Sequence, residues 1–285
     1  MGMIKYMKSK QILILLIILL SFFIQPGQGQ SYQDLPVYEQ EISVLFDSLI
    51  KSGDDKVKME VSQKIVSLFD HILLVDSSFY YPFDSLNNMG KVYSSDHLIR
   101  VYSWNIPLKN GMHKYVGYVQ YLNKNTDSVH LVFLNNPSGV PPENDRDYNS
   151  NNWYGALYYK ILPNECEGKV SYTLLGFRFN NFQTNTKIIE VMNVQEDEVH
   201  FGAPVFHLEK VIKNRVIFEY SARVAMMLRY DDELEMIVFD HLSPTEPQYE
   251  GEYQFYGPDF SYDGLKSTSC YWDLVEDLDL KNKLE

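Results

Sequence analysis

The sequence predicts a mainly β protein, an antiparallel sandwich or distorted barrel of about ten strands that follows an N-terminal helical hairpin. Apolar residues recur at helical spacing over 34–75. After Asp76 the pattern changes to short runs rich in Tyr, Val, Ile and Phe, bounded by Asn, Gly, Pro and Asp. The chain has 285 residues, of which 45% are hydrophobic and 14% aromatic. This composition excludes a disordered tail, a collagen-like fibre and a polytopic membrane protein.

Residues 1–29 have the three parts of a signal peptide. Three lysines precede a run of 13 residues, 12–24, that is apolar except for Ser21, and small residues follow it. The run is shorter than the roughly 20 residues that a membrane-spanning helix needs. We therefore expect cleavage before Gln30 or Ser31, export to the periplasm or the exterior, and no integral membrane segment in the mature chain. A retained anchor helix is the alternative.

Two helices are expected within 34–75. Gly53 can end the first helix and Asp54 can cap the second, because glycine adopts the conformation of a helix end and aspartate accepts hydrogen bonds from free amides. Each helix has one apolar face, so the pair should pack on the chain that follows as a hairpin subdomain. No Pro/Gly/Ser-rich linker divides residues 30–285, which we expect to form a single mainly β domain.

Eleven short strands are expected after the hairpin, with turn residues between them. Asn110-Gly111 and Asp231-Asp232 are typical of hairpin connections, and 135–152 has the composition of a longer polar loop. Residues 187–192 fit a short helix as well as a strand. The expected strands are 97–104, 113–122, 128–134, 153–162, 169–178, 199–207, 214–221, 224–230, 235–240, 252–256 and 269–275.

The chain is strongly acidic, with a formal charge of −13. Removal of residues 1–29 takes away three lysines and no acidic residue, which leaves a charge of −16. Such a surface repels nucleic acid, because phosphate binding depends on clustered Lys and Arg. We therefore expect no nucleic-acid partner.

No motif for a cofactor or a metal is complete. No glycine-rich phosphate loop or dinucleotide fingerprint follows an expected strand, so the sequence predicts no cofactor. Asp145, Asp147 and Asn149 begin like a calcium loop, but Ser150 replaces the required glycine and Ala156 the required acid. The seven histidines lack metal-binding spacing, and we expect no metal site.

Cys166 and Cys270 are the two cysteines, and both would enter an oxidising compartment after export. Each lies in a polar stretch that is typical of a loop or a strand end. A disulfide would close 103 intervening residues and restrict the unfolded chain by about 4–5 kcal/mol in the entropy model. Two free thiols are the alternative, and the sequence leaves both states open.

Aromatic-rich segments along the chain form a recognisable set: 80–86 (YYPFDSL), 113–115 (HKY), 153–159 (WYGALYY), 172–176 (YTLLG), 215–221 (RVIFEYS), 239–244 (FDHLSP) and 255–264 (FYGPDFSYDG). Together they resemble an uncharacterised family of exported bacterial proteins, and the resemblance covers most of the mature chain. It implies export and a chain that folds as one unit. It supplies no activity, because none is assigned to that family.

Two adjacent Asp–His pairs, Asp96-His97 and Asp240-His241, invite a catalytic interpretation in which the carboxylate orients the imidazole as a general base. Neighbouring residues on a strand point to opposite faces, so such a pair forms only where the chain turns. Pro244 favours a turn after Asp240-His241. In the structural alternative, Asp240 only accepts hydrogen bonds from backbone amides in that turn.

Residues 256–264 are the best sequence candidate for a ligand loop, because they contain three aromatic rings, two acids, two glycines and a proline. We predict ligand contacts from Tyr256, Asp259, Tyr262 and Asp263. The two aspartates also resemble the carboxylate pair of a glycosidase, but an extended strand would hold them roughly 13 Å apart, beyond the separation of such a pair. In the alternative, the rings complete the core and the aspartates hold turns.

No complete catalytic constellation is visible. The sequence therefore predicts an exported, non-catalytic binding or cell-envelope module with an aromatic and acidic site. Its ligand is unknown, with a glycan and an envelope protein as candidates. The alternative is a secreted hydrolase that acts on a glycan, with Asp240, Asp259 and Asp263 as acids and His241 as base. Tyrosines suit a binding groove in three runs: 80–81, 154–159 and 253–262.

Overall fold

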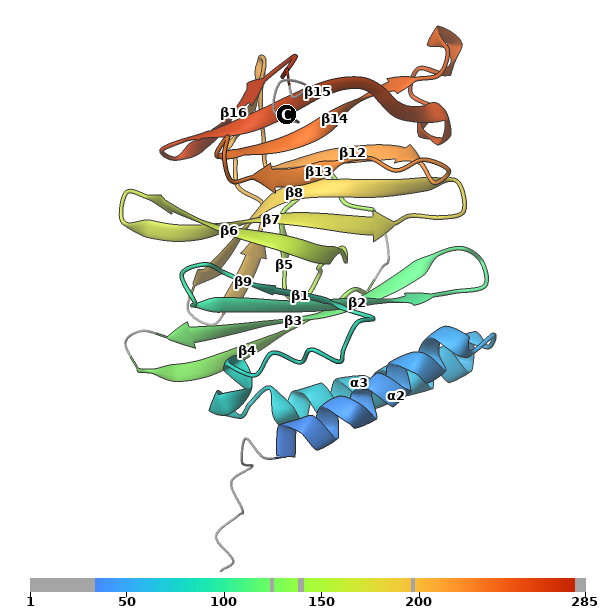
Figure 1. Ribbon diagram of the computed structural model, residues 1–285, viewed down its shortest axis with the longest axis vertical. Helices are drawn as coiled ribbons and strands as arrows, with labels where there is room; N and C mark the ends of the chain where they lie inside the picture. The colour runs from blue at the N-terminus through green and yellow to red at the C-terminus, as the bar shows by residue number, and fades with distance from the viewer. Residues whose placement is uncertain (1–33, 124–125, 138–140, 196–197, 280–285) are drawn as a thin grey trace, which may run out of the picture.

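The computed structural model describes residues 34–123, 126–137, 141–195 and 198–279. Within these residues the protein is a stack of four layers, in which a helical pair covers the first of three β-sheets and the sheets follow one another along the long axis (Figure 1). The described part of the chain is mainly β, its sheets pack like a sandwich, and they form no closed barrel. The predicted fold class is confirmed.

The helical layer consists of α2 (Leu35–Lys51) and α3 (Asp55–Ile72), the two expected helices. The Asp54 side chain accepts hydrogen bonds from the backbone amides of Lys56 (2.8 Å) and Val57 (3.3 Å), as predicted for a helix cap. The apolar faces of both helices are buried against the first sheet. The helical pair is therefore part of the packed body.

Replacing Asp54 with alanine is expected to lower the free energy of unfolding by about 1 kcal/mol, because two amides in the first turn of α3 lose their acceptor. Asparagine keeps a side-chain oxygen at the same place, and Asp54→Asn should leave the stability nearly unchanged. Urea unfolding of the two variants beside the wild type measures the difference. Equal stability of the alanine and asparagine variants would show that the cap contributes nothing.

The first sheet is a four-stranded antiparallel meander in the order β1-β2-β3-β4. On one face, Tyr102, Trp104 and Tyr118 are buried against the helices. On the other face, Val101 and Val119 belong to the core shared with the second sheet. Adjacent residues of this sheet thus face two different cores. The strands are β1 (Gly90–Tyr93), β2 (Ile99–Pro107), β3 (His113–Asn123) and β4 (Ser128–Leu134).

The second sheet runs in the order β5-β9-β8-β7-β6. β12 also belongs to this sheet and pairs with residues 184–190 of β8, whereas β9 pairs with residues 192–195. All of these pairings are antiparallel. Residues 187–192, for which the sequence allowed a helix or a strand, lie inside β8, because β7 and β12 form ladders along its two sides. The strands are β5 (Tyr148–Asn149), β6 (Leu157–Cys166), β7 (Lys169–Phe179), β8 (Thr184–Gln195), β9 (Glu198–Phe201) and β12 (Arg215–Ser221).

The third sheet has the order β11-β10-β16-β15-β14-β13, and its pairings are antiparallel except that β10 and β16 run parallel. Its inner face packs on the second sheet, where Ile237 and Phe239 share a core with Leu175 and Ile189. The strands are β10 (Phe206–Leu208), β11 (Val211–Lys213), β13 (Leu228–Asp231), β14 (Met236–Pro244), β15 (Tyr256–Thr268) and β16 (Tyr271–Val275).

The described residues form sixteen strands, more than the eleven expected. The sequence predicts no strand at β1, β5 or β11, and β5 lies within the expected polar loop 135–152. Three expected segments also differ from the structure. The expected strand 199–207 is two strands, because the chain crosses there from the second sheet to the third. The expected strand 252–256 is largely a 3₁₀ turn. The predicted ligand loop 256–264 is instead the first part of β15, because most of it pairs with β14. The 3₁₀ turns are η2 (Asp76–Phe79), η3 (Pro247–Tyr249) and η4 (Tyr253–Phe255).

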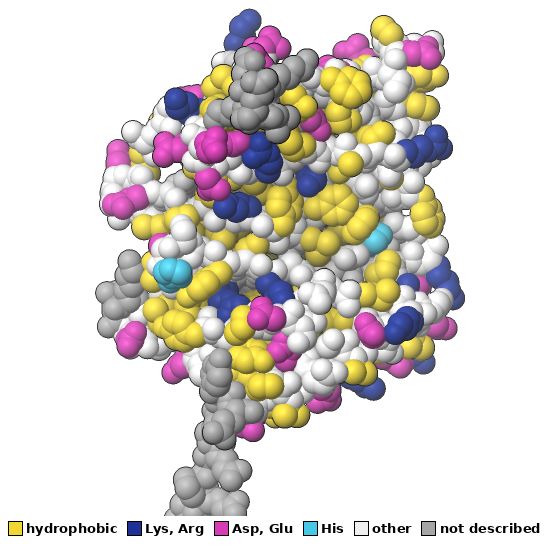
Figure 2. All heavy atoms as spheres, viewed as in Figure 1, with side chains coloured by type: hydrophobic (Ala, Val, Ile, Leu, Met, Phe, Trp, Pro, Cys, Tyr) yellow, Lys and Arg dark blue, Asp and Glu magenta, His cyan; other side chains and the backbone are white. Residues whose placement is uncertain are grey.

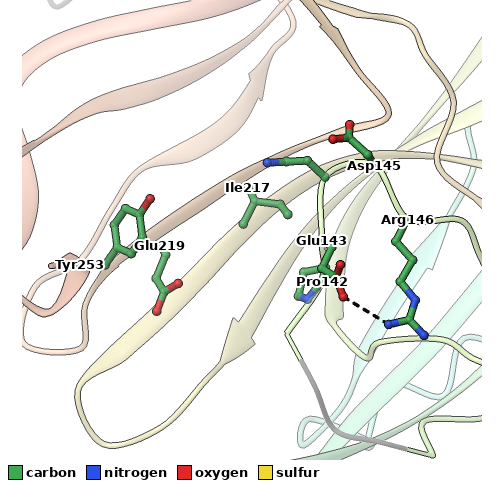
Figure 3. A pocket seen from close by; sticks show the side chains of 8 residues that line it. Pro142, Glu143, Asp145, Arg146, Ile217, Glu219 and Tyr253 are labelled. Atoms are coloured by element: carbon green, nitrogen blue, oxygen red, sulfur yellow. Dashed lines mark hydrogen bonds and ion pairs between the residues drawn. The ribbon is translucent and has the colours of Figure 1, made fainter. Parts of the chain in front are cut away.

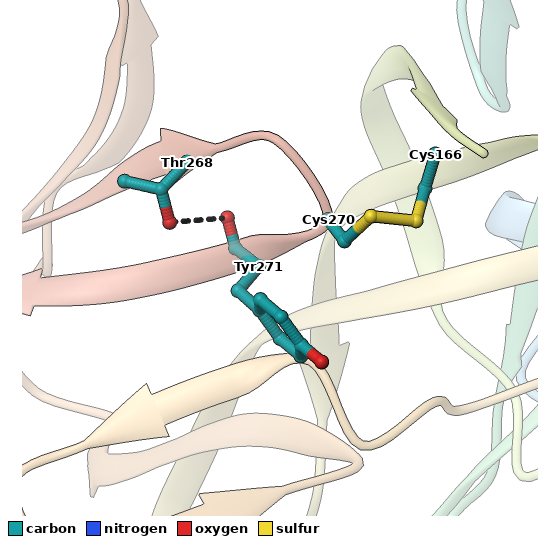
Figure 4. Close-up of a disulfide and its surroundings, with 4 residues drawn as sticks. All are labelled: Cys166, Thr268, Cys270 and Tyr271. Carbon is teal, nitrogen blue, oxygen red and sulfur yellow. Dashed lines mark hydrogen bonds between the residues drawn. A yellow bond between two sulfur atoms is a disulfide. The ribbon is translucent and has the colours of Figure 1, made fainter.

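A disulfide joins Cys166, the last residue of β6, to Cys270, which lies in the turn between β15 and β16 (Figure 4). The two Cα atoms are 5.0 Å apart, within the range of native disulfides. Of the two states that the sequence left open, the structure has the bonded one. The bond fastens an edge of the second sheet to a hairpin of the third.

The predicted signal peptide lies outside the described residues. In the part of the chain that the structure describes, no helix has the length and apolar character needed to cross a membrane. Export and cleavage of residues 1–29 stay predictions.

Candidate functional site

The sequence-predicted residues His241, Asp259 and Asp263 come together where β14 and β15 are irregularly paired. Three residues of β15, 259–261, face the single residue His241 of β14. Such a bulge turns side chains out of the regular alternation of a strand. The two aspartates therefore flank one imidazole ring, whereas an extended strand would have held them roughly 13 Å apart.

The His241 ring lies between two carboxylates. Its Nδ1 is 2.8 Å from an oxygen of Asp263, and its Nε2 is 4.0 Å from an oxygen of Asp259. Half of the His241 side chain is exposed, whereas Asp263 is buried. The contact between Asp263 and His241 has the geometry in which a carboxylate orients an imidazole.

Each of the three predicted aspartates also accepts a hydrogen bond from a backbone amide: Asp240 from Met227 (2.6 Å), Asp259 from Ser261 (3.1 Å) and Asp263 from Asp277 (3.1 Å). Burial raises the pKa of the Asp240 carboxyl, the amide opposes the shift, and the charge of Asp259 adds to it. The aspartates thus hold the bulge and the chain beside it. This is the structural role that the sequence offered as the alternative to catalysis.

The hydrogen bond with Asp263 raises the pKa of His241 above its usual value of 6.5, against the effect of desolvation. The folded state therefore binds this proton more tightly than the unfolded chain. The contact thus stabilises the fold below about pH 6.5, and its contribution is lost as the pH rises through the raised pKa.

We expect Asp263→Asn to lower the His241 pKa measured by NMR, and to destabilise the protein more at about pH 5.5 than at about pH 8.5. An unchanged His241 titration in the variant would contradict the contact.

The aromatic residues of the predicted site are spread along β15. Tyr256 begins the strand, and its hydroxyl accepts a hydrogen bond from the Gly251 amide (3.0 Å). Tyr262 pairs with Asp240 across the ladder and is half-buried. Phe260, in the bulge, is 86% exposed and has a φ of +73°, a conformation that bulky side chains rarely adopt. None of the predicted ligand residues lines the three cavities described next.

The first cavity, the Tyr253 cleft, measures about 580 Å³ and is lined by 142–146, Ile217, Glu219 and Tyr253 (Figure 3). Tyr253 and Glu219 lie at one end of the cleft. Glu143 and Arg146 lie at the other and form an ion pair of 3.2 Å. The cleft combines three carboxylates with one aromatic ring.

A buried ion pair supports the wall of the Tyr253 cleft. Glu190 and Arg215 have fully buried side chains, and Arg215 Nε lies 3.5 Å from the Glu190 carboxylate. The hydroxyls of Tyr154 and Tyr158 donate to the same carboxylate. The guanidinium also donates to three backbone carbonyls of the loop: Glu143 (2.5 Å), Asn144 (3.1 Å) and Arg146 (2.8 Å). One buried cation thus fixes the loop that forms the wall.

The second cavity, the three-sheet groove, measures about 570 Å³ and receives one tyrosine from each sheet. These are Tyr93 of β1, Tyr159 of β6 and Tyr230 of β13. Each of the three strands lies at an edge of its sheet. Figure 2 shows Lys and Arg side chains among hydrophobic side chains across the middle of one face of the molecule.

The tyrosines of the three-sheet groove are held by contacts within the protein. The Tyr159 hydroxyl donates to the Leu228 carbonyl (3.0 Å), and Lys187 Nζ lies 4.5 Å from the centre of the Tyr159 ring. Lys160 Nζ lies 5.5 Å from the centre of the Tyr230 ring. Burial raises the pKa of the Tyr159 hydroxyl and lowers the pKa of the Lys187 ammonium. Fixed rings and shifted pKa values are common at binding sites.

The third cavity measures about 520 Å³ and lies between α3 and the first sheet, with Met59 and Phe133 among its lining residues. Its position makes it a gap between two packed layers. Two of the three tyrosine runs that the sequence singled out contribute to the other two cavities, and the run 80–81 contributes to neither. Tyr159 lines the three-sheet groove and Tyr253 lines the cleft. Sequence reasoning missed Tyr93 and Tyr230, since no local pattern marks either of them.

Among the described residues, no group of three or more His, Cys, Asp or Glu side chains is arranged to hold a metal ion.

Comparison of the chain with protein-family models, with curated proteins and with solved structures finds no match. The inference of function therefore rests on the geometry of these sites.

Proposed function

We propose that the protein is an exported, non-catalytic binding module whose ligand lies in the three-sheet groove. The observation that supports this most is the meeting of three tyrosines, one from each sheet, in one cavity of about 570 Å³. Ligand sites are concave, rich in apolar and aromatic side chains, and measure about 300–1,000 Å³. The groove adds a few polar groups to its rings, among them Asn164 and Asp232. Its volume falls within this range, and its lining combines aromatic rings with hydrogen-bonding groups.

The Tyr253 cleft is the weaker choice because it presents a single aromatic ring, whereas the groove presents three tyrosines. Polar groups in both cavities already have partners within the protein, and in the groove Asn164 Nδ2 donates to the Thr173 hydroxyl (2.5 Å). Glu143 is paired with Arg146, and Glu219 accepts a hydrogen bond of 2.6 Å from the Thr184 hydroxyl. A ligand would need to replace these contacts before it gained its own.

NMR titration of the isotope-labelled mature chain tests the proposal across several classes of ligand. Mixtures of saccharides, of short peptides and of lipid headgroups are added one class at a time. For one class we expect shifts that centre on Tyr93, Tyr159 and Tyr230. Shifts that centre on Tyr253, or no shifts with any class at millimolar concentration, would contradict the proposal.

The hydrolase remains a second proposal because Asp263 and His241 are paired in an orienting geometry, with His241 half exposed. Incubation of the protein with glycans, followed by chromatography of the products, tests it. Products that form with the wild type and not with His241→Ala would favour the hydrolase. Intact glycans with both proteins favour a binding module.

The export part of the proposal rests on the lysines and the apolar run within 1–29. After expression in a bacterium, the protein recovered outside the cytoplasm should begin at Gln30 or Ser31. Mass spectrometry of the intact chain measures this. A chain that keeps residues 1–29 and stays with the membrane would favour the anchor-helix alternative.

A further inference from the structure

The three-sheet groove offers both of the surfaces that a sugar chain needs. The face of a pyranose ring carries C–H groups that pack on an aromatic ring, and its edge carries hydroxyls that need hydrogen-bond partners. Tyr93, Tyr159 and Tyr230 supply the rings. Asn164 and Asp232 supply donors and acceptors within the same cavity.

The cations of the groove are engaged within the protein. Apart from the tyrosines, its ionisable residues are Lys91, Lys160 and Asp232. The Lys91 ammonium donates to the Phe83 carbonyl, and the Lys160 ammonium lies over the Tyr230 ring. Each lysine thus has a contact within the protein, and one carboxylate offsets part of their charge. The groove therefore suits an uncharged ligand better than an anion.

The strand edges beside the groove are unsuited to an added peptide strand. β1 and β6 end their sheets, and an extended peptide can pair with such an edge. The edge of β6, however, carries Pro163, which has no amide hydrogen, the charged Lys160, and a bulge at Tyr159. Prolines, lysines and bulges are the features with which sheet edges resist strand addition. Recognition by side chains is favoured over backbone pairing.

We propose that the three-sheet groove binds an uncharged oligosaccharide, whose rings pack on Tyr159 and Tyr230 and whose hydroxyls bond to Asn164 and Asp232. This inference rests on the proposed function and names the ligand class of the same site. The rings that the sugar meets come from the second and third sheets, so the ligand bridges two layers of the stack.

Isothermal titration calorimetry of the mature chain tests the ligand class with five probes: cellohexaose, xylohexaose and chitohexaose, which are uncharged, an oligogalacturonate, and an acidic peptide. We expect at least one uncharged hexasaccharide to bind. Tyr230→Ala should weaken this binding about tenfold, because one stacked ring is lost. Tyr253→Ala removes the same side chain from the other cavity and should leave the affinity unchanged.

Asp232→Ala is a second variant with little risk to the fold, because Asp232 is exposed in the turn between β13 and β14. It should weaken binding severalfold through the loss of one hydrogen-bond acceptor. Circular dichroism shows whether each variant is folded. Uncharged saccharide binding that both groove variants leave intact would place the site elsewhere and overturn the inference together with the proposed function.

The remaining outcomes separate the inference from the proposed function. Binding of the peptide or the oligogalacturonate alone, weakened by Tyr230→Ala, overturns the ligand class and leaves the groove as the binding site. Failure of all three uncharged saccharides to bind also overturns the ligand class. In that case the NMR shifts at Tyr93, Tyr159 and Tyr230 decide whether the proposed function stands.

Discussion

Replacing Arg215 with methionine is expected to lower the free energy of unfolding by about 3–5 kcal/mol. The guanidinium is fully buried between Glu190 and the loop 142–146. Without it, the Glu190 carboxylate stays buried with no cation, and burial alone raises its pKa. The carbonyls that the guanidinium bonds also lose their donor, which adds to the cost.

Urea unfolding of Arg215→Met measures this loss, and Arg146→Met is the matched control. Arg146 is half exposed and its ion pair with Glu143 lies at the surface. Such pairs contribute about 0–1 kcal/mol, so the control should stay close to the wild type. Equal effects of the two substitutions would contradict the structural role of the buried pair.

Removing the disulfide is expected to lower the free energy of unfolding by about 4–5 kcal/mol. Cys166 and Cys270 are 104 positions apart in sequence, so the bond restricts a long segment of the unfolded chain. It also fastens the end of β6 to the hairpin of β15 and β16. Loss of the bond should therefore loosen the second sheet from the third at that edge.

Urea unfolding of the double variant Cys166→Ser, Cys270→Ser measures the effect. The wild type after reduction with dithiothreitol is the control and should match the double variant. A loss below about 1 kcal/mol would show that the unfolded chain is already compact in this region. Free thiols in the oxidised wild type would contradict the bond itself.

The helical pair is predictable from sequence because its signals are local. Apolar positions at helical spacing and the capping residue Asp54 lie within a few residues of one another, and the structure places both helices where the pattern predicts them. The disulfide is different. The spacing of Cys166 and Cys270 leaves it open, and only the pairing of distant strands brings their Cα atoms within 5.0 Å.

The segment 256–264 shows why amino-acid composition alone does not predict the secondary structure of this protein. Its glycines, proline and aspartates are typical of a loop, but pairing with β14 makes it a strand. The bulge at 259–261 then brings Asp259 and Asp263 to one histidine, which strand alternation alone does not predict. Long-range pairing outweighs local propensity here.

The three-sheet groove could not be predicted from any one segment. Tyr159 belongs to a run that the sequence marked as a binding surface, but its neighbours Tyr154 and Tyr158 are buried in the core. Tyr93 and Tyr230 come from strands that are distant in sequence. They line one cavity with Tyr159 only because the edge strands β1, β6 and β13 of the three stacked sheets lie on the same side of the molecule. The site is a property of the layer arrangement.

A crystal structure of residues 30–285 soaked with the uncharged hexasaccharides tests the binding proposal most directly. We predict a sugar in the three-sheet groove, with its rings on Tyr159 and Tyr230 and a hydroxyl within hydrogen-bond distance of Asp232. A sugar bound in the Tyr253 cleft or beside His241, with the groove empty, would contradict the proposal.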